Sequence, residues 1–262
     1  MFKFINRKHI GIIQIFGTIG GGIRPVVYDD LLSSIQENNN IMAIVLDIDS
    51  PGGSVTASDY LYQRIVAIAE KKPVVAYVRG TGASGAYMLC CAAHKVVASP
   101  GALIGSVGVI SVRPIIEEML GRVGVEVAVN KGGKFKDIGA LWRKPTADEE
   151  ERLQALVDEA YENFVAIVAK SRKIEIDKVR SLATGEIFWA SKAKECGLVD
   201  ELGDLNRSVD IAVGMSNSPR RVRHLTPKKR LVERLFSPFA ESMVASLSAE
   251  IERRFWLDDL RY

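Results

Sequence analysis

Short, dense runs of hydrophobic residues alternate along the chain with longer segments whose hydrophobic positions recur at helical spacing. The run 41–49 (IMAIVLDID) is apolar at most positions, which is typical of a strand buried on both faces. The segment 147–170 has helical periodicity, and Thr146 followed three residues later by Glu149 predicts a capping box at its start. Strands that alternate with helices predict an α/β fold with a mainly parallel sheet. The other predicted strands are 10–16, 73–78, 95–98 and 125–129, and the other predicted helices are 26–36, 55–70, 84–93 and 115–122.

The pattern changes near residue 215, where a stretch rich in Ser, Asn and Pro reads as a linker. We expect residues 1–214 to form one domain, and residues 215–262 to form a basic linker and a C-terminal amphipathic helix. From Phe239 onward, hydrophobic residues recur every four positions. Such a helix can pack on its own domain, contact another subunit, cover an active site or lie on a membrane surface. Four acidic residues weaken the membrane interpretation: Glu250, Glu252, Asp258 and Asp259.

Composition narrows the class of protein. Of the 262 residues, 47% are hydrophobic and 26% are charged, as in an ordinary globular protein, and the net charge of +3 gives no general case for nucleic-acid binding. The adjacent Cys90 and Cys91 and an odd cysteine count favour a reducing compartment over a disulfide framework. No apolar run approaches the roughly 18 residues of a membrane span, and no signal peptide is recognisable. We therefore expect a cytoplasmic protein, with peripheral membrane contact as one role for the C-terminal helix.

Two predicted strands are followed by loops of small residues, at the edge of a parallel sheet where ligands bind. Pro51, Gly52 and Gly53 follow the strand 41–49, and glycines there can turn bare N–H groups toward an oxyanion. Ser84 lies in the sequence GASGA between a strand and a helix, where its hydroxyl can act as a nucleophile and the Gly85 N–H as an oxyanion donor. Taken alone, the first loop is more typical of an ordinary turn, and the second of a serine that caps a helix.

A serine nucleophile requires a base, and the residues alone do not decide which one. The three histidines, His9, His94 and His224, are poorly placed along the chain relative to Ser84. The segment 130–138 (NKGGKFKDI) follows a predicted strand and offers three lysines, and burial can lower a lysine pKa enough for it to act as a base. An ordinary solvated basic loop explains the same segment.

Several segments in the correct order resemble the SppA family of serine peptidases (signal peptide peptidase, or protease IV). They are DSPGG at 49–53, GTGASGAYMLCCAAHKVVASPGALIGSVGV at 80–109, GKFKDIG at 133–139, the helix at 149–172 and ATGEIFWASKAKECGLVDELGDL at 183–205. The resemblance covers about residues 10–213. It implies a ClpP/crotonase-like fold and a Ser/Lys dyad without metal or cofactor. Matched by motif, the resemblance assigns Ser84 as nucleophile, Lys136 as general base, Ser106 as the hydroxyl that orients the lysine, and Gly85 with either Gly52 or Gly53 as oxyanion donors.

The function implied by this resemblance is hydrolysis of peptides, either signal-peptide remnants or unfolded segments. No histidine occurs in the region 105–111, where ClpP-type peptidases carry one, which favours Ser/Lys chemistry. The resemblance also implies a homo-oligomer, and the dyad could form within or between subunits. Many family members carry an N-terminal membrane anchor, which this sequence lacks, so peptides outside a bilayer fit better as substrates. A catalytically silent scaffold that binds peptides or membrane proteins is the alternative, and acyl-CoA chemistry is a weaker one.

Overall fold

The computed structural model describes residues 8–227. Its centre is an eight-stranded sheet with the order β6-β5-β3-β2-β1-β8, in which β4 also pairs with β3 and with β7. Every strand pair is parallel except β5–β6, which confirms the predicted α/β fold. The strands are β1 (His9–Phe16), β2 (Ile41–Ser50), β3 (Val74–Ala83), β4 (Lys95–Ala98), β5 (Leu103–Gly105), β6 (Ile187–Trp189), β7 (Glu201–Leu202) and β8 (Val222–Leu225). The helices are α1 (Pro25–Glu37), α2 (Val55–Ala69), α3 (Gly85–Cys90), α4 (Glu117–Arg122), α5 (Ala147–Arg172), α6 (Ile176–Leu182), α7 (Ala190–Glu195) and α8 (Leu205–Ser216).

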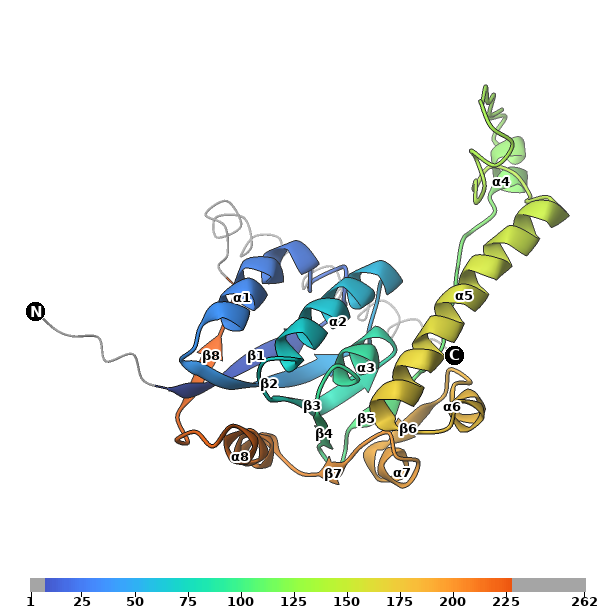
Figure 1. Cartoon of the computed structure of the whole chain (residues 1–262). Coiled ribbons are helices and arrows are strands. Elements are labelled where there is room, and N and C mark those ends of the chain that lie inside the picture. Colours follow the sequence, from blue (N-terminus) through green and yellow to red (C-terminus); the bar gives the residue numbers. More distant parts are fainter. Residues whose placement is uncertain (1–7, 228–262) are drawn as a thin grey trace, which may run out of the picture. The chain divides into compact units, whose positions relative to one another are not determined.

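Helices cover both faces of the sheet (Figure 1). α1, α2 and α3 lie on one face, over the larger hydrophobic core. α8 lies on the other face and packs on β1, β2 and β3. β2 is buried along almost its whole length because it pairs on both sides and is covered from above and below. The dense apolar run at 41–49 thus correctly predicted a strand inside the sheet.

α5 connects the core to a projecting part of the chain. Its capping box is present as predicted, since Thr146 Oγ1 accepts the Glu149 N–H (3.3 Å) and Glu149 Oε2 accepts the Thr146 N–H (2.9 Å). The second half of the helix packs in the core through Phe164, Val165 and Val168. The first half is mostly exposed and leads away from the sheet.

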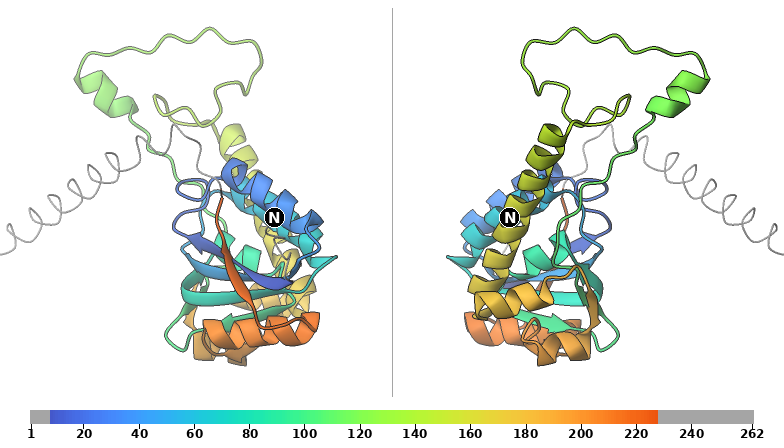
Figure 2. Two further views of the ribbon diagram at one scale, coloured as in Figure 1. Left: turned by 90° about the vertical axis from the view of Figure 1, so that its left-hand side faces the viewer. Right: turned by 90° about the vertical axis from the view of Figure 1, so that its right-hand side faces the viewer.

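Residues 109–146, called the arm below, extend away from the sheet and return to α5 (Figure 2). The prediction of a strand at 125–129 is wrong. These residues lie in the arm, and no segment of the described chain pairs with them. Their valines, with the hydrophobic spacing of a strand, stay about half exposed. Ile110 and Val112 are still more open, at 85% and 84% exposure. The arm therefore presents a hydrophobic surface that nothing in the described part of the chain covers.

The edges of the domain differ from the expected boundaries. β3 continues past residue 78 to Ala83, because Ser50 pairs with Gly82 on one side and β5 pairs with residues 81–83 on the other. The compact unit extends beyond the expected boundary at residue 214 to Leu225, because β8 adds to the sheet beside β1. The predicted C-terminal amphipathic helix lies outside the described residues.

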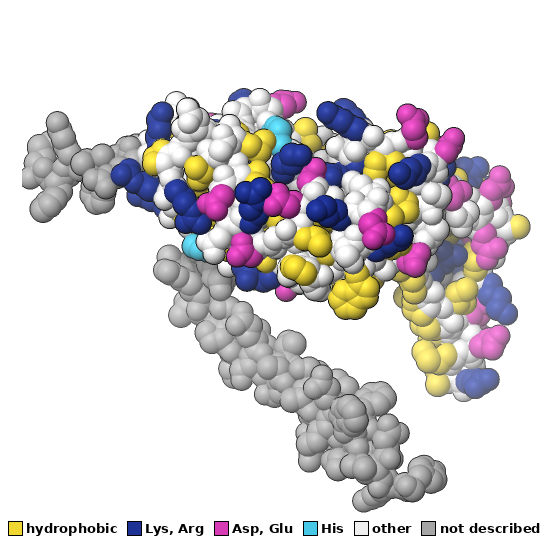
Figure 3. All heavy atoms as spheres, turned by 90° about the horizontal axis from the view of Figure 1, so that it is seen from below, with side chains coloured by type: hydrophobic (Ala, Val, Ile, Leu, Met, Phe, Trp, Pro, Cys, Tyr) yellow, Lys and Arg dark blue, Asp and Glu magenta, His cyan; other side chains and the backbone are white. Residues whose placement is uncertain are grey.

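The described residues were expected to bind no nucleic acid and no metal and to contain no membrane-spanning segment, and three features of the structure concern these expectations. The face seen from below carries basic and acidic side chains close together over much of its area (Figure 3). Among residues 8–227, no helix combines the length and the hydrophobicity that crossing a bilayer requires. Within the same range, no group of His, Cys, Asp and Glu side chains has the arrangement of a metal site.

Candidate active site

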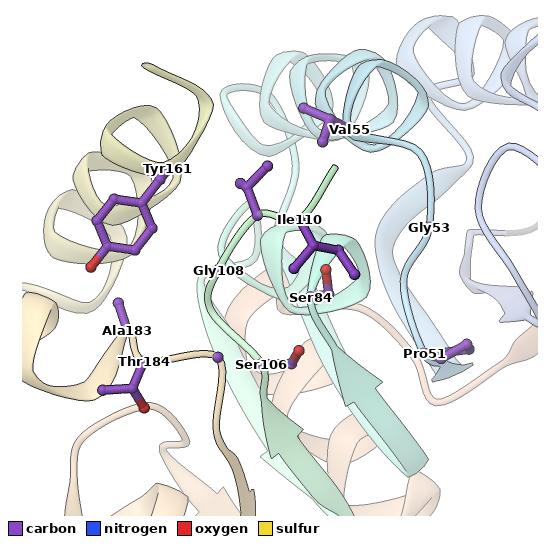
Figure 4. Close-up of a pocket in the computed structure, with 12 residues that line it drawn as sticks. Pro51, Gly53, Val55, Ser84, Ser106, Gly108, Ile110, Tyr161, Ala183 and Thr184 are labelled. Carbon is purple, nitrogen blue, oxygen red and sulfur yellow. The ribbon is translucent and has the colours of Figure 1, made fainter. Parts of the chain in front are cut away.

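A cavity of about 620 Å³ lies where β2, β3 and β5 end (Figure 4). This is the edge of the sheet at which parallel α/β proteins bind their ligands. Its walls come from the loops after these strands and from the region of α5 and α6. The lining residues are Pro51, Gly53, Val55, Ser84, Ser106, Gly108, Val109, Ile110, Tyr161, Ala183, Thr184 and Gly185. The structure thus brings together Ser84, Ser106 and the glycine loop, three of the features that the sequence singled out.

Ser84 occupies the turn between β3 and α3 in a strained conformation. Its φ of 52° lies in the left-handed region, which costs a residue with a side chain on the order of 1–3 kcal/mol. The turn is fixed on both sides, because the Ser84 N–H donates to Gly105 O (2.8 Å) and Ser84 O accepts the Met88 N–H (3.1 Å). The hydroxyl does not cap α3 and lies in the cavity. A sharp strand-to-helix turn that leaves a serine hydroxyl free is the arrangement of a hydrolase nucleophile.

Gly52 brings the loop after β2 directly against this turn. Its φ is 92°, and a Cβ placed on it would lie 2.7 Å from both Ala83 O and Gly85 N. A side chain therefore fits neither the conformation nor the space. The Gly52 N–H donates to Ser50 Oγ (3.1 Å), so it is not free for a ligand.

Two neighbouring N–H groups remain free beside Ser84. Within residues 8–227, neither the Gly53 N–H nor the Gly85 N–H, at the first position of α3, has a hydrogen-bond acceptor. The two backbones adjoin, since a Cβ placed on Gly85 would lie 3.6 Å from Gly53 N. Paired free donors beside a nucleophile are what an oxyanion hole requires. The hydrogen bond of Gly52 favours Gly53 as the partner of Gly85, a choice that the sequence left open.

Ser106 is the second serine of the cavity. Its φ of 49° is also left-handed, and its N–H donates to Glu186 O (2.7 Å). Among the described residues, four non-glycine residues have a positive φ, and Ser84 and Ser106 are the two of them that line this cavity. Backbone strain concentrates at functional sites, so the conformation of both serines supports a chemical role for the cavity.

No general base lines the cavity within one described chain, since its walls hold no His, Lys, Arg, Asp or Glu. His94 Nδ1 accepts the Val74 N–H (3.1 Å) and so has a structural partner. His9 begins β1 and His224 lies in β8 at the edge of the sheet. The histidines are therefore as unsuited to serve Ser84 as their sequence positions predicted.

Lys136 lies in the arm, exposed and apart from Ser84 within one chain. Its loop is attached to the start of α5, where Lys134 pairs with Asp148 and the Arg152 guanidinium stacks 4.1 Å from the centre of the Phe135 ring. Tyr161, which lines the cavity, follows Asp148 on α5 at a distance of about 20 Å, given 1.5 Å per residue. One copy of the chain thus carries the two dyad candidates at separate places.

The three lysines of this loop differ in their surroundings. Lys131 forms an ion pair with Asp137, and Lys134 forms one with Asp148. Within the described residues, Lys136 has no ion-pair partner. The amines of Lys131 and Lys134 are thus held by carboxylates within one chain, whereas the amine of Lys136 is not. The structure therefore favours Lys136 among the three candidates that the residues alone left open.

Comparison with known protein families decides where the chain belongs. The family model described as peptidase family S49 matches residues 67–214, more than half of the sequence. The chain belongs to peptidase family S49. A model described as Clp protease matches residues 7–104 of this S49 chain.

Related sequences agree with the S49 assignment. A putative protease of Synechocystis sp. is 35% identical, over 89% of this chain and 85% of that protein. A putative protease of Methanocaldococcus jannaschii is 39% identical, over 67% of this chain and 57% of that protein. The chloroplastic serine protease SPPA of Arabidopsis thaliana is 32% identical, over 87% of this chain and 35% of that protein. The S49 chain thus spans less than two thirds of the length of the last two relatives.

Solved structures share the fold. A mutant of the membrane-bound stomatin-specific protease 1510-N gives a TM-score of 0.53 at 20% identity, covering 85% of this chain and 99% of that one. A ClpP1 mutant from Listeria monocytogenes gives a TM-score of 0.52 at 17% identity, covering 75% and 93%. These similarities confirm the ClpP-like fold that the S49 motifs implied.

Sequence analysis missed the wall of the cavity opposite Ser84. Ile110, Tyr161 and Thr184 come from three distant segments, and no local pattern marks them as neighbours. The available signal was the position of residues 107–110 directly after the motif serine Ser106. The chain there continues β5 in an extended form toward the arm.

Proposed function

We propose that this S49 chain is a serine peptidase with Ser84 as nucleophile and Lys136 as general base. The observation that carries the proposal is the strained Ser84 turn beside the free N–H groups of Gly53 and Gly85. A strained serine alone is compatible with a structural turn. Two unpaired donors next to it are suited to an oxygen that gains negative charge, such as that of a tetrahedral intermediate.

The reaction is acyl transfer to the serine followed by hydrolysis. Neutral Lys136 Nζ accepts the proton of Ser84 Oγ while Oγ attacks the carbonyl carbon of the scissile bond. The carbonyl oxygen becomes an oxyanion held by the N–H groups of Gly53 and Gly85. The Lys136 ammonium then protonates the leaving amine, the C–N bond breaks and an ester forms on Ser84. A water molecule gives its proton to Lys136, attacks the ester and releases the acid, and the proton returns to Ser84 Oγ.

Ser106 is proposed to orient the lysine amine. Its hydroxyl lies in the same cavity as Ser84, on the wall formed by the end of β5 (Figure 4). Within the described residues, no hydrogen bond occupies that hydroxyl. It is therefore free to accept a hydrogen bond from the amine and to direct the nitrogen lone pair toward Ser84.

We further propose that Lys136 reaches Ser84 from a second copy of the chain. Lys136 lies in the arm, on the loop that Lys134 joins to the start of α5, and the cavity of one chain contains no base. The arm that carries it exposes Ile110, Val112 and the 125–129 valines, a surface typical of a contact between subunits. Assembly through this surface would remove the amine from water and lower its pKa, as a lysine base requires.

The substrate is proposed to be an extended peptide. Gly108, Val109 and Ile110 run alongside Ser84, and within the described residues their N–H and C=O groups make no backbone hydrogen bond. A peptide can add to this edge as a further strand and so present its carbonyl to Ser84. Val55, Ile110 and Tyr161 line the cavity, which favours an apolar substrate side chain near the scissile bond.

The test combines labelling with turnover. Wild type is expected to react with a serine-directed phosphonate at Ser84 and to hydrolyse an apolar fluorogenic peptide. Ser84→Ala is expected to do neither, and Lys136→Ala to lose turnover by at least about 1,000-fold. Lys134→Gln serves as a matched control on the same loop. Full turnover in Lys136→Ala, or no labelling of the assembled wild type, would refute the proposal.

A silent peptide-binding scaffold remains the second candidate, because one chain alone holds no base in its cavity. In that case the strained turn would bind peptides without cleaving them. Peptide binding by both wild type and Ser84→Ala, with no phosphonate labelling at any protein concentration, is the result that this candidate predicts.

A further inference from the structure

One arginine connects the lysine loop of the arm to the start of α5. Arg143 Nε donates to Asp137 Oδ2 (3.0 Å), next in sequence to Lys136. The same guanidinium donates from its two terminal nitrogens to both oxygens of Glu149, at 2.7 and 2.5 Å. The side chains of Asp137 and Glu149 are only 9% and 5% exposed. Such a fork between two shielded carboxylates fixes direction as well as distance.

Glu149 is itself rigidly held. Its carboxylate accepts the Thr146 N–H and its N–H donates to the Thr146 hydroxyl, which closes the capping box of α5. The same helix is anchored in the core by Phe164 and Val168. A continuous series of fixed contacts therefore runs from the core along α5 to Glu149, through Arg143 to Asp137, and ends beside Lys136.

We propose that Arg143 is a positioning residue that holds Lys136 where the amine can meet Ser84. The inference rests on the proposed function, because it presupposes that Lys136 is the base. Arg143 does not touch the cavity around Ser84 and acts only through Asp137. Since the loop is rich in glycine and lysine, this connection supplements the packing that usually orients a catalytic side chain.

Among residues 8–227, the charges around the loop pair Lys131 and Lys134 with carboxylates and leave Lys136 without an ion-pair partner. The charged groups from the loop through the first turns of α5 are Lys131, Lys134, Lys136, Asp137, Arg143, Lys144, Asp148, Glu149, Glu150, Glu151 and Arg152. Asp137 is shared by Arg143 and Lys131, so its charge is already satisfied. The guanidinium holds the pKa of the Asp137 and Glu149 carboxyls well below their usual range. Both stay ionised wherever a lysine base can work, so the connection persists through the active pH range.

The experiment measures kcat and KM from pH 6 to 10.5 in the full-length protein. Arg143→Gln is expected to lower kcat about 10- to 100-fold near neutral pH with little change in KM, since small displacements of a catalytic group have effects of this size. The loosened amine returns toward water, so its pKa rises and the acidic limb of the kcat profile moves to higher pH. Part of the lost activity should therefore return at pH 10. Arg143→Lys is expected to restore little of the lost kcat, because an ammonium lacks the planar fork of donors with which the guanidinium binds both carboxylates at once.

Asp137→Asn breaks the same connection on the loop side and should give the same shift, and it decides the question if Arg143→Gln fails to assemble. Asp148→Asn is the matched control, since it removes a carboxylate from the more exposed ion pair between the same loop and α5, and is expected to stay within about twofold of wild type. An unshifted pH profile in Arg143→Gln or Asp137→Asn would overturn the proposal even if activity fell. If Lys136→Ala is inactive, that failure concerns Arg143 alone, whereas an active Lys136→Ala removes the proposed function itself.

Discussion

The contact of Gly52 with the Ser84 turn gives a prediction whose size follows from the structure. In Gly52→Ala, the new Cβ would lie 2.7 Å from Ala83 O and Gly85 N, so these atoms must retreat by about 0.7 Å to reach an ordinary contact of 3.4 Å. The hydrogen bonds of an oxyanion hole span about 2.7–3.1 Å, and a shift of that size removes the Gly85 donor. The φ of 92° adds a backbone penalty on the order of 1–3 kcal/mol.

We therefore expect Gly52→Ala to lower kcat by about 100- to 1,000-fold, the effect of losing one oxyanion donor. The assay is hydrolysis of a fluorogenic peptide, with circular dichroism to show that the variant is folded. Gly101→Ala is the matched control, because a Cβ there meets no atom within 4 Å and the residue does not line the cavity. A folded Gly52→Ala with kcat within threefold of Gly101→Ala would refute the assignment of the oxyanion hole.

Three further predictions concern the lysine and the arm. Ser106→Ala should lower kcat about tenfold or more and leave KM nearly unchanged, since the hydroxyl is proposed to orient the base and not to bind substrate; an unchanged kcat would exclude that role. The lowered pKa of Glu149, about 2, means that its ionised form stabilises the folded arm at neutral pH and that this contribution fades as pH falls from about 4 through 2. The protection of amides in the arm, after correction for the intrinsic pH dependence of hydrogen exchange, should therefore be the same at pH 6 and pH 8. Protection that is already lost at pH 6 would contradict this prediction. Val127→Asp should weaken assembly and activity together, as measured by light scattering and turnover at several concentrations, because it places a charge on the exposed valine row; an active, fully assembled variant would show that this row is not a contact.

The parts of the fold that sequence patterns predicted are those stabilised by local or whole-strand burial. β2 is buried nearly throughout, so its residues are apolar in sequence, and α5 carries its own start signal in Thr146 and Glu149. β5, β6 and β7 have only two or three residues each, and their partners lie far along the chain. No periodicity can arise in so short a strand, so pattern analysis passed over them.

The strand predicted at 125–129 is absent from the structure for a different reason. Its alternating valines have the composition of a strand, yet a strand also needs a partner with which to pair, and the described chain supplies none. The pattern still holds information, because it marks a surface suited to burial. We interpret the disagreement as a sign of the proposed contact between copies.

The candidate site shows the same division. The turn chemistry of the two glycine-rich loops pointed to Ser84 and Gly85 because glycine and small residues act locally. The choice of Gly53 over Gly52 depended on the Ser50 hydroxyl, and the link between Asp137 and Glu149 depended on Arg143. Such side-chain hydrogen bonds join residues that no spacing rule relates.

The most direct test of the account mixes two inactive variants. Ser84→Ala keeps Lys136, and Lys136→Ala keeps Ser84. A site shared between copies is therefore restored wherever a Lys136→Ala chain supplies Ser84 and a neighbouring Ser84→Ala chain supplies Lys136. Co-expressed in equal amounts, they should regain about one quarter of the wild-type activity, the share expected from random assembly of a two-chain site. Activity no higher than that of either variant alone, in oligomers shown by mass spectrometry to contain both, would contradict a dyad made from two copies.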